Sequence, residues 1–391
     1  MIEFMIPAGF DAYMDDFVPL AEGFQELGVP YRANRPYWSS VVSGPTLFST
    51  ATVSTDAVKV RIYSYRAFQY FSPNGIALKP ALDWVSSIGD EAINVLIDNA
   101  DGYTTASTEH YWRFHRVLRT HMNRRCGFGS NVLPWALGFG NRVLRALPSH
   151  CAPCSARNRQ ALMNFGASHP YEHQTRRLFS QRFSNAASKH VQIDYTKDDL
   201  SRAPTDPWDR LMWEQTQKRH CRAYYERLAE SQVVAAFCGE LIPPAPYRPS
   251  YLVGGGIAEL KRKVYELLAP FDHRPLRSIQ WDSWRFWEGL VAGCVVFNID
   301  LDYYGVRLPV MPENGKHYIG LRLDRIEEGV DEVLRDPASM SQIAQAGRTW
   351  ALSNYAPTAI ARRFLWLIGE ETSSLRLKLN CTDYDSVLRS G

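Results

Sequence analysis

A carboxylate lies inside the segment SWRFWEGLVAGCVVFNID, residues 283–300, where a charged and aromatic start gives way to small apolar residues and then to a β-type run. This pattern predicts a short helix that leads directly into a buried strand, with Glu288 near the start of the helix. Two roles for Glu288 are open. A carboxylate in the first turn is stabilised by the helix dipole, so it can cap its own helix. Its two acceptor oxygens also suit the hydroxyls of a vicinal diol such as a ribose, and Gly289 and Gly293 allow close backbone approach.

The loop NFGASHP, residues 164–170, is a second candidate site. It follows an apolar segment and precedes an amphipathic helix, and Gly166 and Ser168 let backbone amides approach a ligand. Exposed N–H groups and a helix N-terminus both favour an anion such as phosphate. Arg176 and Arg177, further along that helix, could add charge-assisted hydrogen bonds. A tight turn with solvated arginines is the alternative, because no phosphate-loop or dinucleotide glycine motif accompanies the loop.

Two carboxylates, Asp98 and Asp101, follow the apolar segment AINVLIDNADG, residues 92–102. A carboxylate at the carboxyl end of a buried strand can act as the general base that takes a proton from a hydroxyl. Aspartates after strands are also common in turns and helix caps. Catalysis and a turn are therefore both open for this pair.

The seven cysteines are odd in number and scattered, which argues against a disulfide scaffold and favours a reducing, cytoplasmic setting. Cys151 and Cys154, with Cys126 elsewhere, could bind zinc, but a second nearby pair of ligands is missing. Free thiols in a connecting loop are the favoured interpretation. The acidic pair Asp300 and Asp302 follows a predicted strand, and no metal site is expected there.

Strand and helix patterns alternate along the whole chain. Apolar segments that begin at residues 2, 58 and 92 predict strands of a first half, and segments near residues 160, 190, 233 and 295 predict strands of a second half. Such alternation with short loops favours parallel sheets. The stretch 111–125 is compatible with a helix or a strand. We predict domains over 1–155 and 156–368 and a tail over 369–391, with ligands at the carboxyl ends of the strands.

Composition excludes several classes of protein. The 391 residues carry a net charge of only +3, which gives no global field for nucleic acid. No apolar stretch approaches the ~20 residues of a membrane span, and the start of the chain does not resemble a signal peptide. We therefore predict a cytoplasmic protein, and leave peripheral contact with a membrane open.

The segment around Glu288 resembles a known family. A carboxylate, small residues, AGC and then a β run are similar to the nucleotide-sugar site of GT-B glycosyltransferases, in particular the C-terminal domain of glycosyl transferases group 1 with its spore-maturation-protein-like and exostosin-like branches. The likeness spans about residues 220–368. Arg285, Glu288, Leu290, Gly293 and Cys294 match the family pattern R-x-x-E-x-L-A-x-G-C, and the alanine of the pattern has its counterpart one position later, in Ala292.

The resemblance implies an α/β fold of GT-B type: two Rossmann-like domains whose parallel sheets face across a cleft. It implies transfer of a sugar from a nucleoside-diphosphate donor, UDP or GDP, to a glycan or other hydroxyl acceptor. Glu288 matches the second glutamate of the family's paired motif, which binds the ribose. The first glutamate would stand eight positions earlier, where this chain departs from the family's pattern and has Gln280.

The family's other motif places the remaining candidates. GKHYIGL, residues 315–321, resembles its "hyi.y" element, which makes His317 a catalytic candidate and Tyr318 a donor-binding one. Arg285 and helix N-termini can neutralise a diphosphate, so we predict no cofactor and no metal requirement. A nucleotide-sugar epimerase and a non-catalytic glycan-binding or assembly protein are the alternatives.

Overall fold

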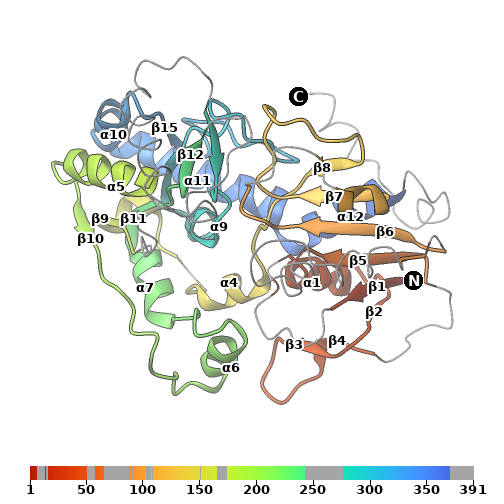
Figure 1. Ribbon diagram of the computed structural model, residues 1–391. Helices are drawn as coiled ribbons and strands as arrows, with labels where there is room; N and C mark the ends of the chain where they lie inside the picture. The colour runs from red at the N-terminus through yellow and green to blue at the C-terminus, as the bar shows by residue number, and fades with distance from the viewer. Residues whose placement is uncertain are drawn as a thin grey trace, which may run out of the picture.

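The computed structural model of the 391-residue chain describes residues 1–6, 14, 16–50, 58–65, 88–89, 91–102, 107, 109–149, 151–164, 174–242 and 276–369. Two parallel sheets with surrounding helices make up this part of the chain (Figure 1). The last strand of the first sheet ends at Pro134 and the first strand of the second sheet begins at Asn158.

The first sheet has six strands in the order β2-β1-β5-β6-β7-β8, and every neighbouring pair is parallel. Its strands are β1 (Ile2–Met5), β2 (Tyr31–Ala33), β5 (Val60–Ser64), β6 (Ile93–Asp98), β7 (Arg116–Arg119) and β8 (Val132–Pro134), with α1 (Val18–Glu26) between the first two. The predicted strands at residues 2, 58 and 92 are confirmed. The ambiguous stretch 111–125 contains the end of a 3-10 turn, η1 (Glu109–Arg113), and then β7. An antiparallel hairpin, β3 (Tyr37–Ser39) and β4 (Thr46–Phe48), lies beside this sheet.

The second sheet has the strand order β10-β9-β11-β14-β15 and is also parallel throughout. Its strands are β9 (Asn158–Leu162), β10 (Gln192–Asp194), β11 (Ser231–Ala235), β14 (Val295–Ile299) and β15 (Ile319–Leu321). A separate antiparallel ribbon is formed by β12 (Glu240–Ile242) and β13 (Arg277–Ile279). The predicted strands of the second half are therefore also confirmed.

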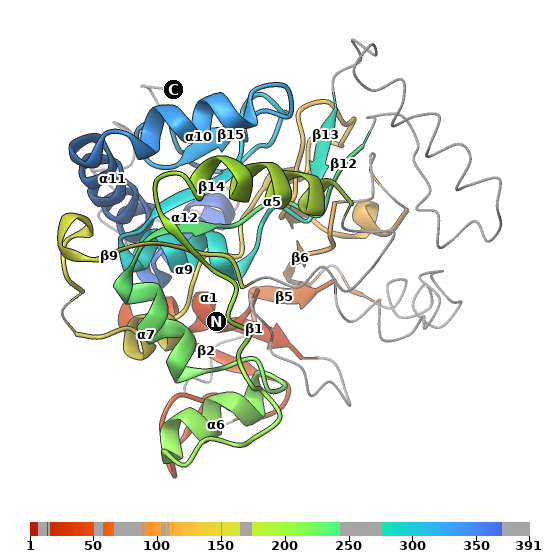
Figure 2. The ribbon, with the colours of Figure 1, turned by 90° about the vertical axis from the view of Figure 1, so that its left-hand side faces the viewer.

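Helices cover both faces of the second sheet. On one face lie α5 (Gln174–Ala187) and α10 (Ile326–Leu334), which pack against each other (Figure 2). On the other face, α9 (Trp284–Ala292) packs between β14 and α11 (Pro337–Tyr355). Further elements are η2 (Cys154–Ala156), α6 (Pro207–Gln215) and α7 (Arg222–Glu230). Because both faces are covered, central strands such as β11 and β14 are buried along their whole length.

Two glycines make the tight passage from α9 to β14 possible. A Cβ on Gly289 would collide with Val234 of the neighbouring strand, so helix and sheet approach closely at this point. Gly293 has a φ of 77°, and this left-handed residue ends the helix as its N–H bonds back to the carbonyl of Leu290. The predicted succession of helix and buried strand is confirmed.

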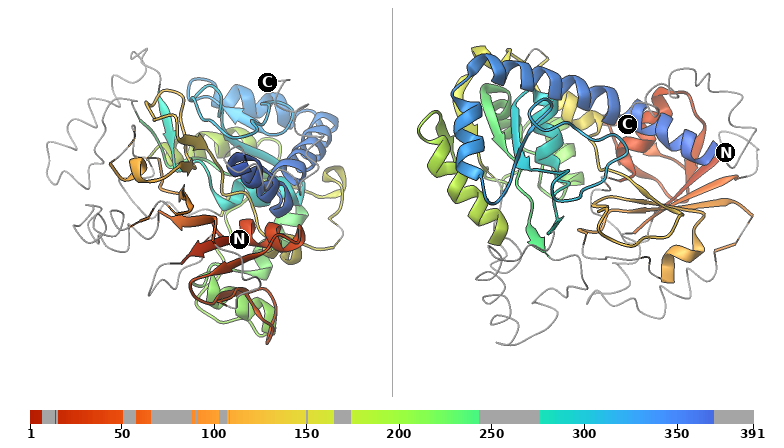
Figure 3. Two further views of the ribbon diagram at one scale, coloured as in Figure 1. Left: turned by 90° about the vertical axis from the view of Figure 1, so that its right-hand side faces the viewer. Right: turned by 90° about the horizontal axis from the view of Figure 1, so that it is seen from above.

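Two segments tie the halves together. The helix α4 (Asn141–Ala146) follows the first sheet, and its backbone at Asn141 donates to Glu22 of α1. The last described helix, α12 (Pro357–Gly369), comes after the second sheet in the chain but returns to pack on α1, with the rings of Phe24 and Phe364 5.6 Å apart. Figure 3 shows α11 and α12 running from one half to the other.

The carboxyl ends of both sheets border one cavity. Asn99, His121 and Leu137 follow strands β6, β7 and β8 of the first sheet, and Asn164 follows β9 of the second; all four line it. The predicted fold class, two Rossmann-like domains with parallel sheets facing across a cleft, is therefore confirmed. None of the helices in the described part of the chain is long and apolar enough to cross a membrane.

Candidate functional site

The cavity between the two sheets has a volume of about 660 Å³, which lies in the usual range for a small-molecule site. Its first-sheet wall carries Asp101 and His121. Its second-sheet wall is formed by loops after β9 and β10, by the segment before α7, and by the first turns of α7 and α9. The lining residues from that side are Asn164, Lys197, Asp198, Leu200, Arg219, Cys221, Tyr224, Tyr225, Asp282, Ser283, Trp284, Arg285 and Glu288.

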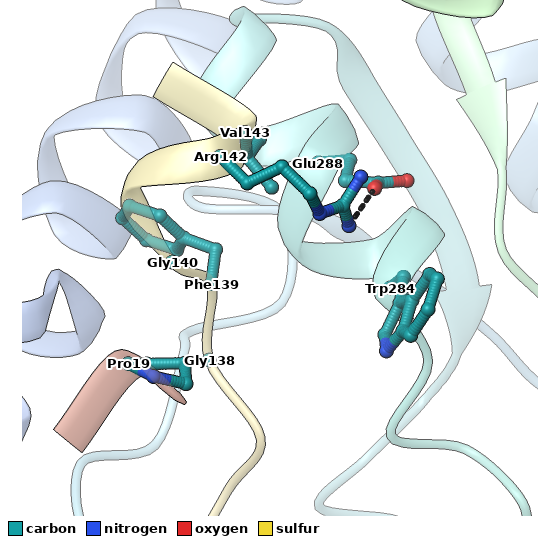
Figure 4. A pocket seen from close by; sticks show the side chains of 8 residues that line it. All are labelled: Pro19, Gly138, Phe139, Gly140, Arg142, Val143, Trp284 and Glu288. Atoms are coloured by element: carbon teal, nitrogen blue, oxygen red, sulfur yellow. Dashed lines mark ion pairs between the residues drawn. The ribbon is translucent and has the colours of Figure 1, made fainter. Parts of the chain in front are cut away.

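Glu288 lines this cavity, and only 3% of its surface is exposed. Tyr224 donates a hydrogen bond of 2.9 Å to Oε2, and Tyr225 donates one of 2.7 Å to Oε1. Arg142 reaches across from α4, with its Nη2 3.6 Å from Oε1 (Figure 4). A carboxylate has about four lone-pair directions. Each oxygen therefore keeps capacity for one further donor from a ligand.

The structure contradicts one of the two roles that the sequence left open for Glu288. It is the fifth residue of α9, which has no acidic residue in its first turn, and the N-cap position belongs to Ser283. The dipole effect is concentrated in the first turn. Glu288 is therefore not a cap of its own helix, and the interactions that hold its charge come from two other helices.

The tyrosines act as donors to Glu288 because their protons are held firmly. Burial, and then the negative charge of Glu288, raises the pKa of Tyr224 well above its ordinary value. Burial does the same for Tyr225, against the opposing effect of Arg142. Both hydroxyls therefore stay protonated at any physiological pH, and they hold the carboxylate in one orientation.

Arg142 is positioned by contact with a neutral histidine, His220. Nη1 of Arg142 contacts Nδ1 of His220 at 3.3 Å, and Nε2 of His220 lies 2.9 Å from Asp209. Since a guanidinium has only donors, Nδ1 must accept and the proton must sit on Nε2. Burial, and next the charge of Arg142, lowers the pKa of His220 to about 4. Arg222 completes the chain with two hydrogen bonds to Asp209.

Three cations line the cavity without an acidic partner among the described residues: Lys197, Arg219 and Arg285. Arg285 is half-buried and donates from Nε and Nη2 to the side chain and backbone oxygens of Asn164, both at 3.2 Å. The Arg219 guanidinium lies 5.9 Å from the ring centre of Trp284, and Lys197 is exposed. The carboxylates nearby are engaged elsewhere, for example Asp198 with Arg227 at 2.6 Å. Cations gathered in this way leave a positive charge that an anionic ligand can neutralise.

The two candidate bases lie in different surroundings. Asp98 is 1% exposed, and its carboxylate is taken up by Arg119 and Tyr111 inside the first domain. Asp101 is exposed and lines the cavity. Gln280 of the other half contacts it through two hydrogen bonds, from its backbone N–H at 2.9 Å and from Nε2 at 3.3 Å. Only Asp101 of the pair is placed where it could meet a substrate.

His121 is a cavity residue that the sequence did not single out. It is buried, and its Nε2 accepts the backbone N–H of Asp282 at 3.2 Å. Burial, and then the charge of Arg119, lowers the pKa of its ring to about 3, so the ring is neutral. Its φ of 48° is positive, which is uncommon for a residue other than glycine. No sequence signal pointed to His121, because the stretch that contains β7 was not assigned as a strand. The place of His121 directly after a strand was therefore not predicted.

The remaining predicted donor-binding residues do not line the cavity or lie outside the described residues. Gly166 and Ser168 lie outside the described residues, so the structure does not test the predicted anion-binding loop, residues 164–170. Arg176 donates to the backbone oxygens of Phe237 and Cys238, at 3.1 and 3.3 Å. Arg177 is exposed on α5 and does not line the cavity.

The motif around residue 317 also lies apart from the cavity. The Nδ1 of His317 accepts the backbone N–H of Glu313, and the ring stacks on Trp350 with centres 5.7 Å apart. Tyr318 is buried, and its hydroxyl accepts the backbone N–H of Leu301 at 2.9 Å. Both side chains therefore support the second sheet and its loops in this structure.

Within the described part of the chain, no group of three or more His, Cys, Asp or Glu side chains could hold a metal ion. Cys126, Cys151 and Cys154 are free thiols there. Asp302 pairs with Arg124 at 2.7 Å, and Asp300 accepts the backbone N–H of Tyr303. The carboxylates of Asp300 and Asp302 therefore stabilise the loop after β14.

Sequence reasoning missed most of the partners that define the site. Tyr224, Tyr225, Arg142, Lys197 and Arg219 were not singled out as site residues. The signal that could have found the tyrosines is their position one turn into a helix that leads to a central strand. No local signal could have found Arg142, because it comes from the other half of the chain.

Comparisons with known proteins give similarities in structure only. No protein-family model matches the chain, and no curated protein sequence matches it. Its structure is similar to that of AviGT4, a glycosyltransferase involved in avilamycin A biosynthesis, with 12% identity, 94% of this chain and 96% of that chain covered, and a TM-score of 0.45. Anabaena HepE in complex with UDP is 9% identical, with 94% of this chain and 99% of that chain covered and a TM-score of 0.46. A glycosyltransferase from Rickettsia africae is 11% identical, with 94% of this chain and 97% of that chain covered and a TM-score of 0.45. The match to TarM covers only 54% of the length of TarM. At these values the similarities carry no argument about function.

Proposed function

We propose that this protein is a glycosyltransferase that binds a nucleoside-diphosphate sugar in the cavity between its two sheets and transfers the sugar to a hydroxyl acceptor. The observation that carries the proposal is the set of three cations, Lys197, Arg219 and Arg285, which have no acidic partner among the described residues and line one cavity of about 660 Å³. A diphosphate is an anion of the size and charge that such a set can neutralise. The resemblance of residues 220–368 to group 1 glycosyltransferases supports the same class.

Within this proposal, Glu288 holds the ribose. This residue lines the cavity, and its carboxylate is fixed by Tyr224 and Tyr225 and retains lone pairs for a diol. Arg285, one turn earlier on α9, and the N–H groups at the start of that helix lie next to the diphosphate. These groups neutralise the diphosphate without a metal ion, so EDTA should not abolish activity.

Asp101 is the proposed general base. It lies on the wall opposite α9, it is exposed to the cavity, and a carboxylate can accept the acceptor hydroxyl's proton as the sugar is transferred. Asp98 is not proposed as the base, because its carboxylate is paired with Arg119 inside the first domain. The sugar and the nucleobase of the donor are not assigned.

The test is a thermal shift with UDP, GDP, CDP and TDP, followed by donor hydrolysis and transfer assays. A ligand at a hundred times its dissociation constant stabilises the folded state by about 2.7 kcal/mol, which is a measurable shift. Stabilisation by a nucleoside diphosphate but not by the nucleoside supports the proposal. Stabilisation by none of the four contradicts it and favours the non-catalytic alternative, whereas donor turnover to a new nucleotide sugar without acceptor favours the epimerase.

A further inference from the structure

Gln280 follows β13 at the edge of the cavity, in the position where the resembling family has its first glutamate. Its backbone is left-handed, with a φ of 53°. A non-glycine residue adopts this conformation at a cost of about 1–3 kcal/mol, and such residues gather at functional sites. Other interactions must therefore hold Gln280 in place.

Those interactions come from both halves of the molecule. The Gln280 N–H donates to the backbone oxygen of Asp101 at 2.9 Å, and its Nε2 donates to Oδ2 of the same residue at 3.3 Å. On the other side, Oε1 lies against Gly239, where an added Cβ would collide with it. The amide thus lies between Gly239 and the carboxylate of Asp101, which is 179 residues away in the chain.

The chemistry of the contact explains why an amide is needed there. Facing a carboxylate, an amide can present its NH2 group as a donor, whereas a second carboxylate could only repel. When two carboxylates share one site, the charge of each opposes ionisation of the other, and the pKa of one of them rises. A glutamate at position 280 would therefore make Asp101 harder to ionise.

We propose that Gln280 is a positioning residue that orients the Asp101 carboxylate toward the cavity and keeps it ionised as a base. This inference rests on the proposed function. It also accounts for the departure from the family's paired glutamates: glutamine stands at position 280 because its neighbour is Asp101. Among the described residues, Arg176 of α5 also interacts electrostatically with Asp101, and the ring of His121 on the same wall is neutral.

The test compares Gln280→Glu and Gln280→Leu with the parent. The pKa of Asp101 is measured by NMR in protein labelled with 13C at the aspartate carboxyl carbons, and Asp101→Asn assigns the signal. Gln280→Glu should raise that pKa by about one unit or more, and Gln280→Leu should raise it less, because a donor is lost but no charge is added. The acid limb of the pH profile of kcat/KM should move with the pKa. The control is Gln342→Glu on the exposed face of α11, which adds the same charge away from the cavity.

Two results would overturn the proposal. An Asp101 pKa that is the same in Gln280→Glu as in the parent shows that the two side chains do not interact. A pKa that moves while the pH profile does not shows that Gln280 positions no catalytic base. If the parent turns over no nucleotide sugar, the proposed function has failed, and the NMR titration still decides whether Gln280 holds the Asp101 carboxylate. A lower melting temperature with an unchanged pKa would indicate a structural role alone.

Discussion

Replacement of Glu288 by glutamine should weaken both folding and ligand binding. The amide keeps the shape, and one tyrosine hydroxyl can still donate to its oxygen, but two hydrogen bonds to a charged group become bonds to a neutral one. Each such change costs roughly 1 kcal/mol. Loss of the Glu288 charge also removes the ion pair of Arg142, which is itself nearly buried. Breaking a buried pair costs about 3–5 kcal/mol, and the bonds that Arg142 keeps to Tyr225 and His220 reduce this figure. We expect a total loss of roughly 2–4 kcal/mol.

This stability effect differs from the one that the sequence suggests. A carboxylate in a first helical turn would contribute only about 0.3–1 kcal/mol through the dipole. The assay is urea unfolding of the free protein followed by tyrosine and tryptophan fluorescence, with Glu226→Gln as the control. Glu226 is an exposed residue of α7, so its replacement should leave the unfolding midpoint unchanged.

Binding is measured by calorimetry below the unfolding transition. If Glu288 holds the ribose, affinity for the intact nucleoside diphosphate should fall roughly tenfold to a hundredfold, because a hydrogen bond to a charged group is worth about 1.5–3 kcal/mol. A 2′,3′-dideoxy nucleotide should bind the variant and the parent almost equally. A variant that unfolds at the parent's urea concentration refutes the reasoning about the buried cluster. A variant that is destabilised but binds the intact nucleotide as well as the parent does refutes the ribose role.

Three further outcomes are expected. Lys197→Ala and Arg219→Ala should each weaken binding of a nucleoside diphosphate more than binding of the nucleoside, because only the diphosphate carries the anion. Calorimetry at low salt measures both affinities, and equal losses would mean that neither cation contacts phosphate. His220 has a folded-state pKa of about 4, below the ordinary 6.5, so the unfolded chain binds its proton more readily and stability falls as pH drops from 6.5 toward 4. His220→Gln can still accept from Arg142 and donate to Asp209, so its unfolding midpoint should fall less over that pH range than the parent's; an identical decline would show that His220 is not the group that titrates. EDTA should leave activity largely intact, and a full loss restored by manganese or magnesium would direct attention to Asp300 and Asp302.

Local patterns in the sequence predicted much of the secondary structure. The alternation of apolar segments with amphipathic ones predicted strands of both sheets, and the succession of α9 and β14 was predicted from one segment of eighteen residues. These features depend on hydrophobic periodicity and on glycines, which act over a few residues. The stretch 111–125 stayed ambiguous because η1 and β7 are too short to establish a period.

The sequence by itself determined that this chain forms two parallel α/β units, and it drew attention to Glu288, Arg285 and Asp101. Only the tertiary structure decided what surrounds them. Arg142 meets Glu288, and Gln280 meets Asp101, across the boundary between the two halves. Asp98 and Asp101 stand three residues apart, yet one is buried against Arg119 and the other lines the cavity. Whether a carboxylate is a partner of the protein or of a ligand depends on burial and on distant neighbours, and neither is encoded in a local pattern.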